Sequence, residues 1–180
     1  DNGTVFLNAD DDLLSTCICR QSKVLYGLSE NADVRAENIK TESAAKQTCD
    51  IISGKRRMHV GIPAYGPHMV YAALEGAAVG IKFGLSDDEI IRGIAAYKTV
   101  GRRANVIDTG YITIIDDCYN ANPDSVKCAI DSMAEGGGRK VCILGDMLEM
   151  GTERAARHAD IGRYAVRKRS EEHTSELQSP

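Results

Sequence analysis

The sequence lacks any apolar run that approaches membrane-spanning length, and its N-terminus carries no basic stretch followed by an apolar one. Neither a transmembrane helix nor an export signal is therefore expected. It also lacks a basic stripe, since the densest basic cluster is Lys55-Arg56-Arg57 and the formal net charge is −4. This charge balance disfavours a nucleic-acid backbone as the main partner.

The cysteines lack the spacing of a metal site or a disulfide framework. They stand at positions 17, 19, 49, 118, 128 and 142, and no two of them are spaced like paired zinc ligands. Cys17 and Cys19 are two residues apart, so a helix would place them on different faces. Free thiols in a reducing compartment are expected, which predicts a cytoplasmic protein and no metal bound by this segment.

The common phosphate-gripping motifs are also missing. "GGGRK" (136–140) precedes a strand pattern, whereas a phosphate loop follows a strand and opens a helix. "SGKRR" (53–57) has neither the following Ser or Thr nor a glycine five residues earlier. The absence of G-x-G-x-x-G counts against a dinucleotide-binding dehydrogenase. His59 and His158 have no evident nucleophile or metal partner, so both are predicted to be structural.

The residues that are present predict a folded α/β chain. Its 180 residues, 43% apolar and 27% charged, suffice for one domain or two small ones. Apolar β-rich runs predict strands at 4–7, 22–29, 32–39, 48–53 and 57–63, with a hairpin at Gly54 and a short helix over 13–20.

Helical periodicity is clearest over 68–84. Its predicted inward face comprises Val70, Ala73, Leu74, Ala77, Ala78 and Ile81. Ser86 and Glu89 match a capping box that opens the next helix, with Ile90, Ile91, Ile94 and Ala95 expected to face inward. The following "YKTVGRR" (97–103) reads as a joint between domains.

After the joint the pattern alternates between strand and helix. Strands are predicted over 111–115 and 140–144, and a helix is predicted to start at Pro123 with Asn122 as its N-cap. A last helix is predicted to be capped by Thr152. Because strands that alternate with helices usually form parallel sheets with right-handed crossovers, we expect a Rossmann-like parallel sheet here.

Polar groups cluster where the predicted strands end. Asp116 and Asp117 follow the first strand of this part, and Asp146 follows the second. Ligands of parallel α/β sheets bind beyond the carboxyl ends of the strands. Such carboxylates can accept hydrogen bonds from a ribose, ligate magnesium through water or hold an ammonium group. The alternative is that they only cap the following helix.

The C-terminal stretch "RSEEHTSELQSP" (169–180) breaks the helical pattern that precedes it. It matches the translation of a common sequencing adapter, so we expect residues 169–180 to be an artefact without regular structure. The natural protein would then continue beyond Lys168, and the chain would be a fragment.

Three motifs together resemble the Mur ligase family, the ATP-dependent ligases of bacterial peptidoglycan (cell-wall) biosynthesis. They are "IDDCYNANPDSVKCAIDSM", "GRKVCILGDMLEMG" and the helix that contains His158. "VFLNADDD", "ADVRAENI", "GPHMVYAAL" and "GRRANVI" resemble the later half of the family's central domain. The likeness is strongest to the members that add D-alanyl-D-alanine to a UDP-N-acetylmuramoyl-tripeptide, and it spans about Gly3 to Lys168.

The resemblance implies a division of the chain and a fold class. Residues 1–102 would be the C-terminal half of the central ATP-binding α/β domain. Residues 103–168 would begin the Rossmann-like, parallel-sheet C-terminal domain. The full-length parent would be an ATP- and Mg²⁺-dependent carbon–nitrogen ligase, with the tripeptide and dipeptide substrates as its partners.

The resemblance also implies site residues. Arg103, Asp117, His68 and Tyr119 would bind the nucleotide, with Asp117 toward the ribose and His68 at the start of the helix beside the adenine. Asn120, Asn122 and Asp146 would face the incoming dipeptide. No catalytic or metal-binding residue is expected in this segment.

Some expected features are missing. The family's phosphate loop and its magnesium-holding carbamoylated lysine lie in regions that this sequence does not contain, so the fragment alone is expected to be inactive. Ala72 stands where the family commonly has Asn, so the adenine hydrogen bond that this Asn would make in the family is not expected from Ala72. Another Mur-type amino-acid ligase and a non-catalytic nucleotide-binding α/β module remain the alternatives.

Overall fold

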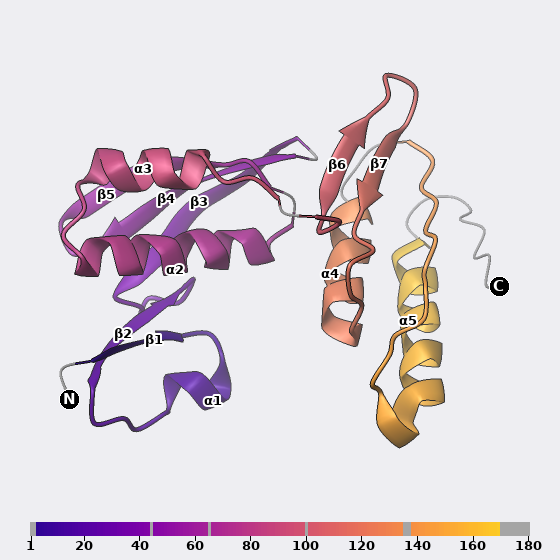
Figure 1. The fold of residues 1–180 in the computed structure, drawn as a ribbon, viewed down its shortest axis with the longest axis horizontal. Coiled ribbons are helices and arrows are strands. Elements are labelled where there is room, and N and C mark those ends of the chain that lie inside the picture. The colour runs from indigo at the N-terminus through magenta and orange to yellow at the C-terminus, as the bar shows by residue number, and fades with distance from the viewer. Residues whose placement is uncertain (1–2, 44, 65, 100, 135–137, 170–180) are drawn as a thin grey trace. The chain divides into compact units, whose positions relative to one another are not determined.

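The computed structural model describes residues 3–43, 45–64, 66–99, 101–134 and 138–169. The predicted tail over 169–180 therefore lies outside the described residues except for the helical backbone of Arg169. The chain divides into two compact units, residues 1–98 and 99–180 (Figure 1). No helix within the described ranges is both long and apolar enough to cross a membrane.

The first unit is built on a five-stranded mixed sheet in the order β1-β2-β3-β4-β5. The strands are β1 Thr4–Asn8, β2 Ser22–Gly27, β3 Val34–Ser43, β4 Lys46–Ser53 and β5 Arg56–Ile62. β1, β2 and β3 pair in parallel, whereas β3, β4 and β5 form an antiparallel meander. Gly54, with a φ of 58°, provides the left-handed turn between β4 and β5, as the hairpin prediction requires.

The described residues of this unit form three helices, α1 Asp12–Ser15, α2 His68–Lys82 and α3 Asp87–Ala95. α2 and α3 cover the same face of the sheet (Figure 1), and α2 contacts all five strands. The predicted stripe of α2 is confirmed, because Val70, Ala73, Leu74, Ala77 and Ala78 are buried and Ile81 packs against them.

The predicted start of α3 is also confirmed. Ser86 accepts a hydrogen bond from the Glu89 N–H, and the Glu89 carboxylate accepts one from the Ser86 N–H. Ile90 is buried and Ile91 and Ile94 pack against the core, but Ala95 is exposed, so that inward assignment was wrong. Ala95 lies at the C-terminal end of α3, next to Ile94, which still packs against the core.

The second unit contains β6 Asn105–Asp108, β7 Thr113–Asp116, α4 Pro123–Ala134, a 3₁₀ turn at Gly151–Glu153 and α5 Arg154–Arg169. Ile130, Met147, Ile161 and Ala165 form its own core between α4 and α5. Thr152 lies inside the 3₁₀ turn and does not cap α5, contrary to expectation.

The chain as a whole is α/β, as predicted, but two local expectations for the second unit were wrong. The strand predicted at 111–115 occurs as β7, yet it pairs antiparallel with β6. Residues 140–144 do not form a strand. Their side chains alternate as in a strand, with Val141 and Ile143 exposed and Cys142 and Leu144 against the core. The periodicity therefore indicated which side chains face the core, but it did not indicate a pairing partner.

Candidate functional site

The polar residues after β7 meet the segment that precedes β6, within the second unit. Three hydrogen bonds join the two segments. Arg102 Nε donates to Asp116 Oδ2 at 3.0 Å, the Ala104 N–H donates to Asp117 Oδ1 at 2.9 Å, and the Tyr119 N–H donates to the Arg102 carbonyl at 3.1 Å. The short antiparallel β6–β7 ladder thus brings 101–104 and 116–119 together.

The two adjacent aspartates have different surroundings. Asp116 is half-buried, and the Cys118 thiol and the Arg102 guanidinium lower the pKa of its carboxyl group. Asp117 is exposed, and the Ala104 N–H holds one of its carboxylate oxygens. Ala104 has a φ of 46°, which is unusual for a residue with a side chain and fits a backbone that is held to make this contact.

Arg103 and Tyr119 form the exposed part of the site. The Arg103 guanidinium lies 4.1 Å from the centroid of the Tyr119 ring, and Tyr119 itself is 65% exposed. Stacking fixes the orientation of a cation that could bind a phosphate, and it leaves ring surface for a flat group. The structure therefore brings Arg103, Asp117 and Tyr119 together in one unit. His68 lies in the other unit, where it starts α2 as predicted.

The residues predicted to face a dipeptide make structural contacts. The Asn122 side-chain oxygen accepts a hydrogen bond from the Ser125 N–H at 2.9 Å, so Asn122 caps α4. Asp146 pairs with Arg154, and its other oxygen lies 2.7 Å from His158 Nε2. Asn120 is exposed in the loop between β7 and α4.

Sequence reasoning missed the roles of Arg102 and Ala104. Arg102 stands beside Arg103, and nothing in the sequence says which arginine turns back to Asp116. Ala104 acts through its backbone N–H, which no residue pattern reveals. A backbone N–H next to a strand predicts the contact between Ala104 and Asp117 only weakly, because that contact depends on the antiparallel register of β6 and β7.

A second polar centre lies at the carboxyl end of the parallel strands β1 and β2. Asp10 accepts hydrogen bonds from the N–H groups of Leu28 and Ser29 and from the Tyr71 hydroxyl. Burial alone would raise the pKa of Asp10, but these hydrogen bonds outweigh it and lower the pKa. The sequence showed the acidic run 10–12 but not that Asp10 turns back onto the next loop.

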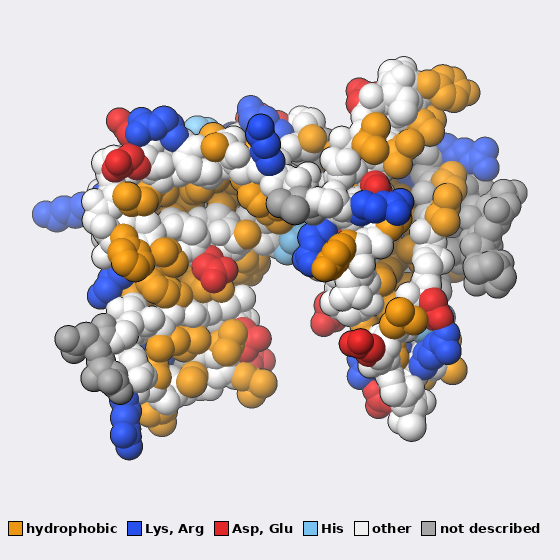
Figure 2. Space-filling model, in the orientation of Figure 1, with side chains coloured by type: hydrophobic (Ala, Val, Ile, Leu, Met, Phe, Trp, Pro, Cys, Tyr) orange, Lys and Arg blue, Asp and Glu red, His pale blue; other side chains and the backbone are white. Residues whose placement is uncertain are grey.

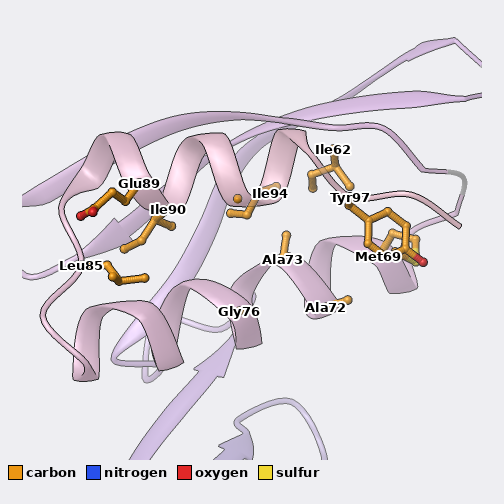
Figure 3. Close-up of a pocket in the computed structure, with 11 residues that line it drawn as sticks. Ile62, Met69, Ala72, Ala73, Gly76, Leu85, Glu89, Ile90, Ile94 and Tyr97 are labelled. Atoms are coloured by element: carbon orange, nitrogen blue, oxygen red, sulfur yellow. The ribbon is translucent and has the colours of Figure 1, made fainter.

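An apolar groove of about 250 Å³ runs between α2 and α3 (Figure 3). Met69, Ala72 and Tyr97 lie together at one end, and Leu85, Glu89 and Ile90 lie at the other. Hydrophobic side chains are exposed over these helices in Figure 2. Because Ala72 is short, this end of the groove offers apolar surface and the Tyr97 hydroxyl where a longer side chain could offer an amide.

The described residues contain no evident magnesium site. No group of three or more His, Cys, Asp or Glu side chains within them converges on a point that could hold a metal ion. The carboxylates of Asp116, Asp117 and Asp146 instead engage backbone N–H groups or cationic side chains.

Comparison with known proteins identifies relatives over nearly the whole chain. Residues 102–172 match the family model described as Mur ligase, glutamate ligase domain. UDP-N-acetylmuramoyl-tripeptide–D-alanyl-D-alanine ligase of Mycobacterium tuberculosis is 31% identical over 176 residues, which cover 92% of this chain and 34% of the relative. The ligase of the same name from Escherichia coli is 33% identical over 171 residues, which cover 92% of this chain and 37% of the relative.

Solved structures give the same neighbours. A crystal structure of MurF from Acinetobacter baumannii superposes with a TM-score of 0.83 at 25% identity, over 92% of this chain and 37% of that one. MurC from Thermotoga maritima shares the fold, with a TM-score of 0.70 at 20% identity over 97% of this chain and 43% of that one. The chain thus spans about a third of the length of the curated relatives it matches.

Proposed function

We propose that the chain belongs to the Mur ligase family and is part of an ATP-dependent ligase that joins D-alanyl-D-alanine to a UDP-N-acetylmuramoyl-tripeptide. One observation carries the proposal: relatives that bear the name of this activity are 31% and 33% identical over 92% of the chain. Because the chain spans only 34% and 37% of those relatives, the activity is proposed for the full-length parent.

We propose the loops at 101–104 and 116–119 as this segment's contribution to nucleotide binding. Asp117 has one oxygen fixed by the Ala104 N–H, which leaves the other oriented to accept a hydrogen bond from a ribose hydroxyl. Arg103 is held on the Tyr119 ring and can pair with a phosphate oxygen. His68, at the start of α2, would lie on the nucleobase side.

The reaction itself needs groups that this segment does not supply. When bound, ATP supplies the phosphoryl group that activates the tripeptide carboxylate, and the amine of the dipeptide then displaces phosphate to form the amide. Among the described residues, no group of three or more His, Cys, Asp or Glu side chains could hold the magnesium ion. Asn120, Asn122 and the loop around Asp146 would orient the dipeptide, so this segment contributes to binding rather than to the bond-making step.

The test is a substrate panel on the purified parent enzyme. Phosphate release is measured with ATP and UDP-N-acetylmuramoyl-tripeptide, in the presence of D-alanyl-D-alanine or of single amino acids. We expect release only with the dipeptide, and a product whose mass is that of the pentapeptide. Release that depends on a single amino acid would assign the chain to another member of the family, and ATP binding without release would favour a non-catalytic module.

A further inference from the structure

His158 occupies an unusual position on the second turn of α5. Its Nδ1 lies 2.8 Å from the Arg154 carbonyl oxygen. A carbonyl oxygen can only accept, so Nδ1 must carry a proton. The other ring nitrogen, Nε2, is then the one whose protonation changes when the imidazole gains or loses charge.

Nε2 faces two partners with opposite requirements. The Met147 N–H points at it from 2.9 Å and needs an acceptor, whereas Asp146 Oδ1 lies 2.7 Å away and needs a donor. A neutral ring offers a lone pair to Met147 and repels the carboxylate. A charged ring offers a proton to Asp146 and can no longer accept from Met147. The two hydrogen bonds are therefore mutually exclusive.

Both partners belong to one short loop, residues 145–150, which runs toward the 3₁₀ turn before α5. The Met147 side chain is 2% exposed in the core of the second unit, and Glu149 has a left-handed φ of 61°. The side chains of Met147 and Met150 anchor the loop to this core, while the backbone N–H next to Asp146 depends on which hydrogen bond His158 can make.

The charged groups around the ring can be accounted for on each neighbouring element. The loop contributes Asp146, whose second oxygen is bound by the Arg154 guanidinium. Glu153, in the 3₁₀ turn, pairs with Arg157 on α5 at 2.6 Å. The α4 groups seen in ion pairs with α5 meet it elsewhere, Lys127 at Asp160 and Asp131 at Lys168. Asp146 is therefore the carboxylate that competes for Nε2.

We propose that His158 is a positioning residue that sets the 145–150 loop, holding the Met147 amide when neutral and the Asp146 carboxylate when charged. Its consequence for dipeptide binding rests on the proposed function, in which this loop faces the dipeptide. The exchange of hydrogen bonds between His158 and the loop is independent of the proposed function.

Selective ¹⁵N-methionine labelling of the full chain tests the exchange directly. The sequence has five methionines, so the spectrum should contain five backbone signals, and Met147→Leu identifies the one of interest. The pH is varied over about 5 to 8, where histidines titrate. We expect the Met147 signal to move together with the His158 ring signals, and its exchange protection to fall about 5-fold as the ring becomes charged.

Two variants and a control decide the outcome. His158→Gln keeps a neutral acceptor and should abolish the pH-dependent movement. Asp146→Asn removes the competing carboxylate and should reduce the movement, because an amide attracts the charged ring less than a carboxylate does. His59→Gln is the matched control, because His59 also lies beside a carboxylate, Asp50 at 2.8 Å, but in the first unit. A static Met147 signal while His158 titrates, or movement that survives in His158→Gln, would overturn the proposal.

A kinetic measurement on the parent ligase links the loop to the substrate. His158→Gln should alter the pH profile of the KM for D-alanyl-D-alanine and leave that of ATP unchanged. A parent with no dipeptide-dependent activity would refute the proposed function while the methionine signals still report on His158. An active parent whose two KM profiles are both unaffected would refute the positioning role.

Discussion

At the scale of single residues, Asp10 shows how one carboxylate can join several elements of the first unit. Asp10 follows β1. Its carboxylate accepts hydrogen bonds from N–H groups of the loop after β2 and from the Tyr71 hydroxyl on α2. The close approach requires Gly27, because a Cβ at that position would lie 2.7 Å from Asp10 Oδ2. This contact explains the glycine at the end of β2, since glycine otherwise weakens a strand.

The Asp10–Tyr71 contact should set how the first unit responds to high pH. Burial and the hydrogen bond to Asp10 raise the pKa of Tyr71 to about 12, whereas an unfolded tyrosine ionises near pH ~10. The stabilisation is thus complete below about pH 10 and is lost as the pH rises toward 12. Tyr71→Phe should remove this part of the alkaline loss, measured as the urea midpoint between about pH 8 and 12. Tyr111→Phe, at a side chain that is 94% exposed, is the control. Parallel alkaline losses in all three proteins would rule the contact out.

The adjacent aspartates should have separable effects in the parent enzyme. Asp117→Ala removes the proposed ribose acceptor and should weaken ATP binding about 10- to 100-fold, the equivalent of a charge-assisted contact of roughly 1.5–3 kcal/mol. Asp116→Ala instead removes the partner of Arg102 and should lower the melting temperature more than the ATP affinity.

Steady-state kinetics with ATP and D-alanyl-D-alanine varied separately distinguish the two aspartates. The dipeptide KM should hardly change in Asp117→Ala. Equal effects of both substitutions on ATP would mean that these carboxylates only support the local fold, and the nucleotide assignment would be withdrawn.

At the scale of elements, the sequence predicted what local patterns determine. The α2 stripe follows from a 3.6-residue period sustained over four turns, and the α3 start follows from the Ser86–Glu89 pair. Pairing is not a local property, so β6, only four residues long, was not predicted and β7 was given the wrong kind of neighbour. The site shows the same division. Asp117 stands out as a carboxylate at a strand end, and Arg103 and Tyr119 were assigned from the family resemblance, but the Ala104 N–H that orients Asp117 is visible only in three dimensions.

Gln47 on β4 is a further long-range contact that no local pattern indicates. It is 5% exposed, and its Nε2 donates to the carbonyls of Ala64 at 3.1 Å and Gly66 at 2.8 Å. Gly66 also accepts from the Met69 N–H in the first turn of α2. Gln47 therefore fixes the loop from which α2 and His68 begin.

Replacing Gln47 should loosen this loop more than the rest of the unit. Gln47→Leu leaves the buried Ala64 carbonyl without its side-chain donor and takes one of two donors from the Gly66 carbonyl, which should cost about 1–3 kcal/mol. Val60→Ala, a truncation in the same core, should lower the free energy of unfolding by a similar amount but leave the loop protected from hydrogen exchange. Hydrogen exchange of residues 64–70 in both variants checks this, since equal protection of the segment at equal stability would contradict the role of Gln47.

At the scale of the whole molecule, the chain by itself should not turn over ATP. Its sequence contains no phosphate loop, and its described residues contain no cluster that could hold magnesium. Magnesium-dependent phosphate release from purified residues 1–168 should be indistinguishable from buffer, while the full-length parent is active under the same conditions. Turnover by the fragment that is lost in Asp117→Ala would show that the segment carries a complete catalytic site.

The groove between α2 and α3 has a consequence for protein engineering. Its walls include Gly76 and Gly93, both inside helices, and a Cβ added at either would meet no atom within 4 Å. An interior helical glycine is about 0.8–1.0 kcal/mol less favourable than alanine, so Gly76→Ala and Gly93→Ala should each raise the melting temperature while narrowing the hollow. Gly80→Ala is the contrasting change, because its Cβ would lie 3.0 Å from the Ile90 side chain. If the two groove substitutions stabilise the protein but weaken the parent's ATP affinity, the glycines lower the folding stability in order to keep the binding surface open.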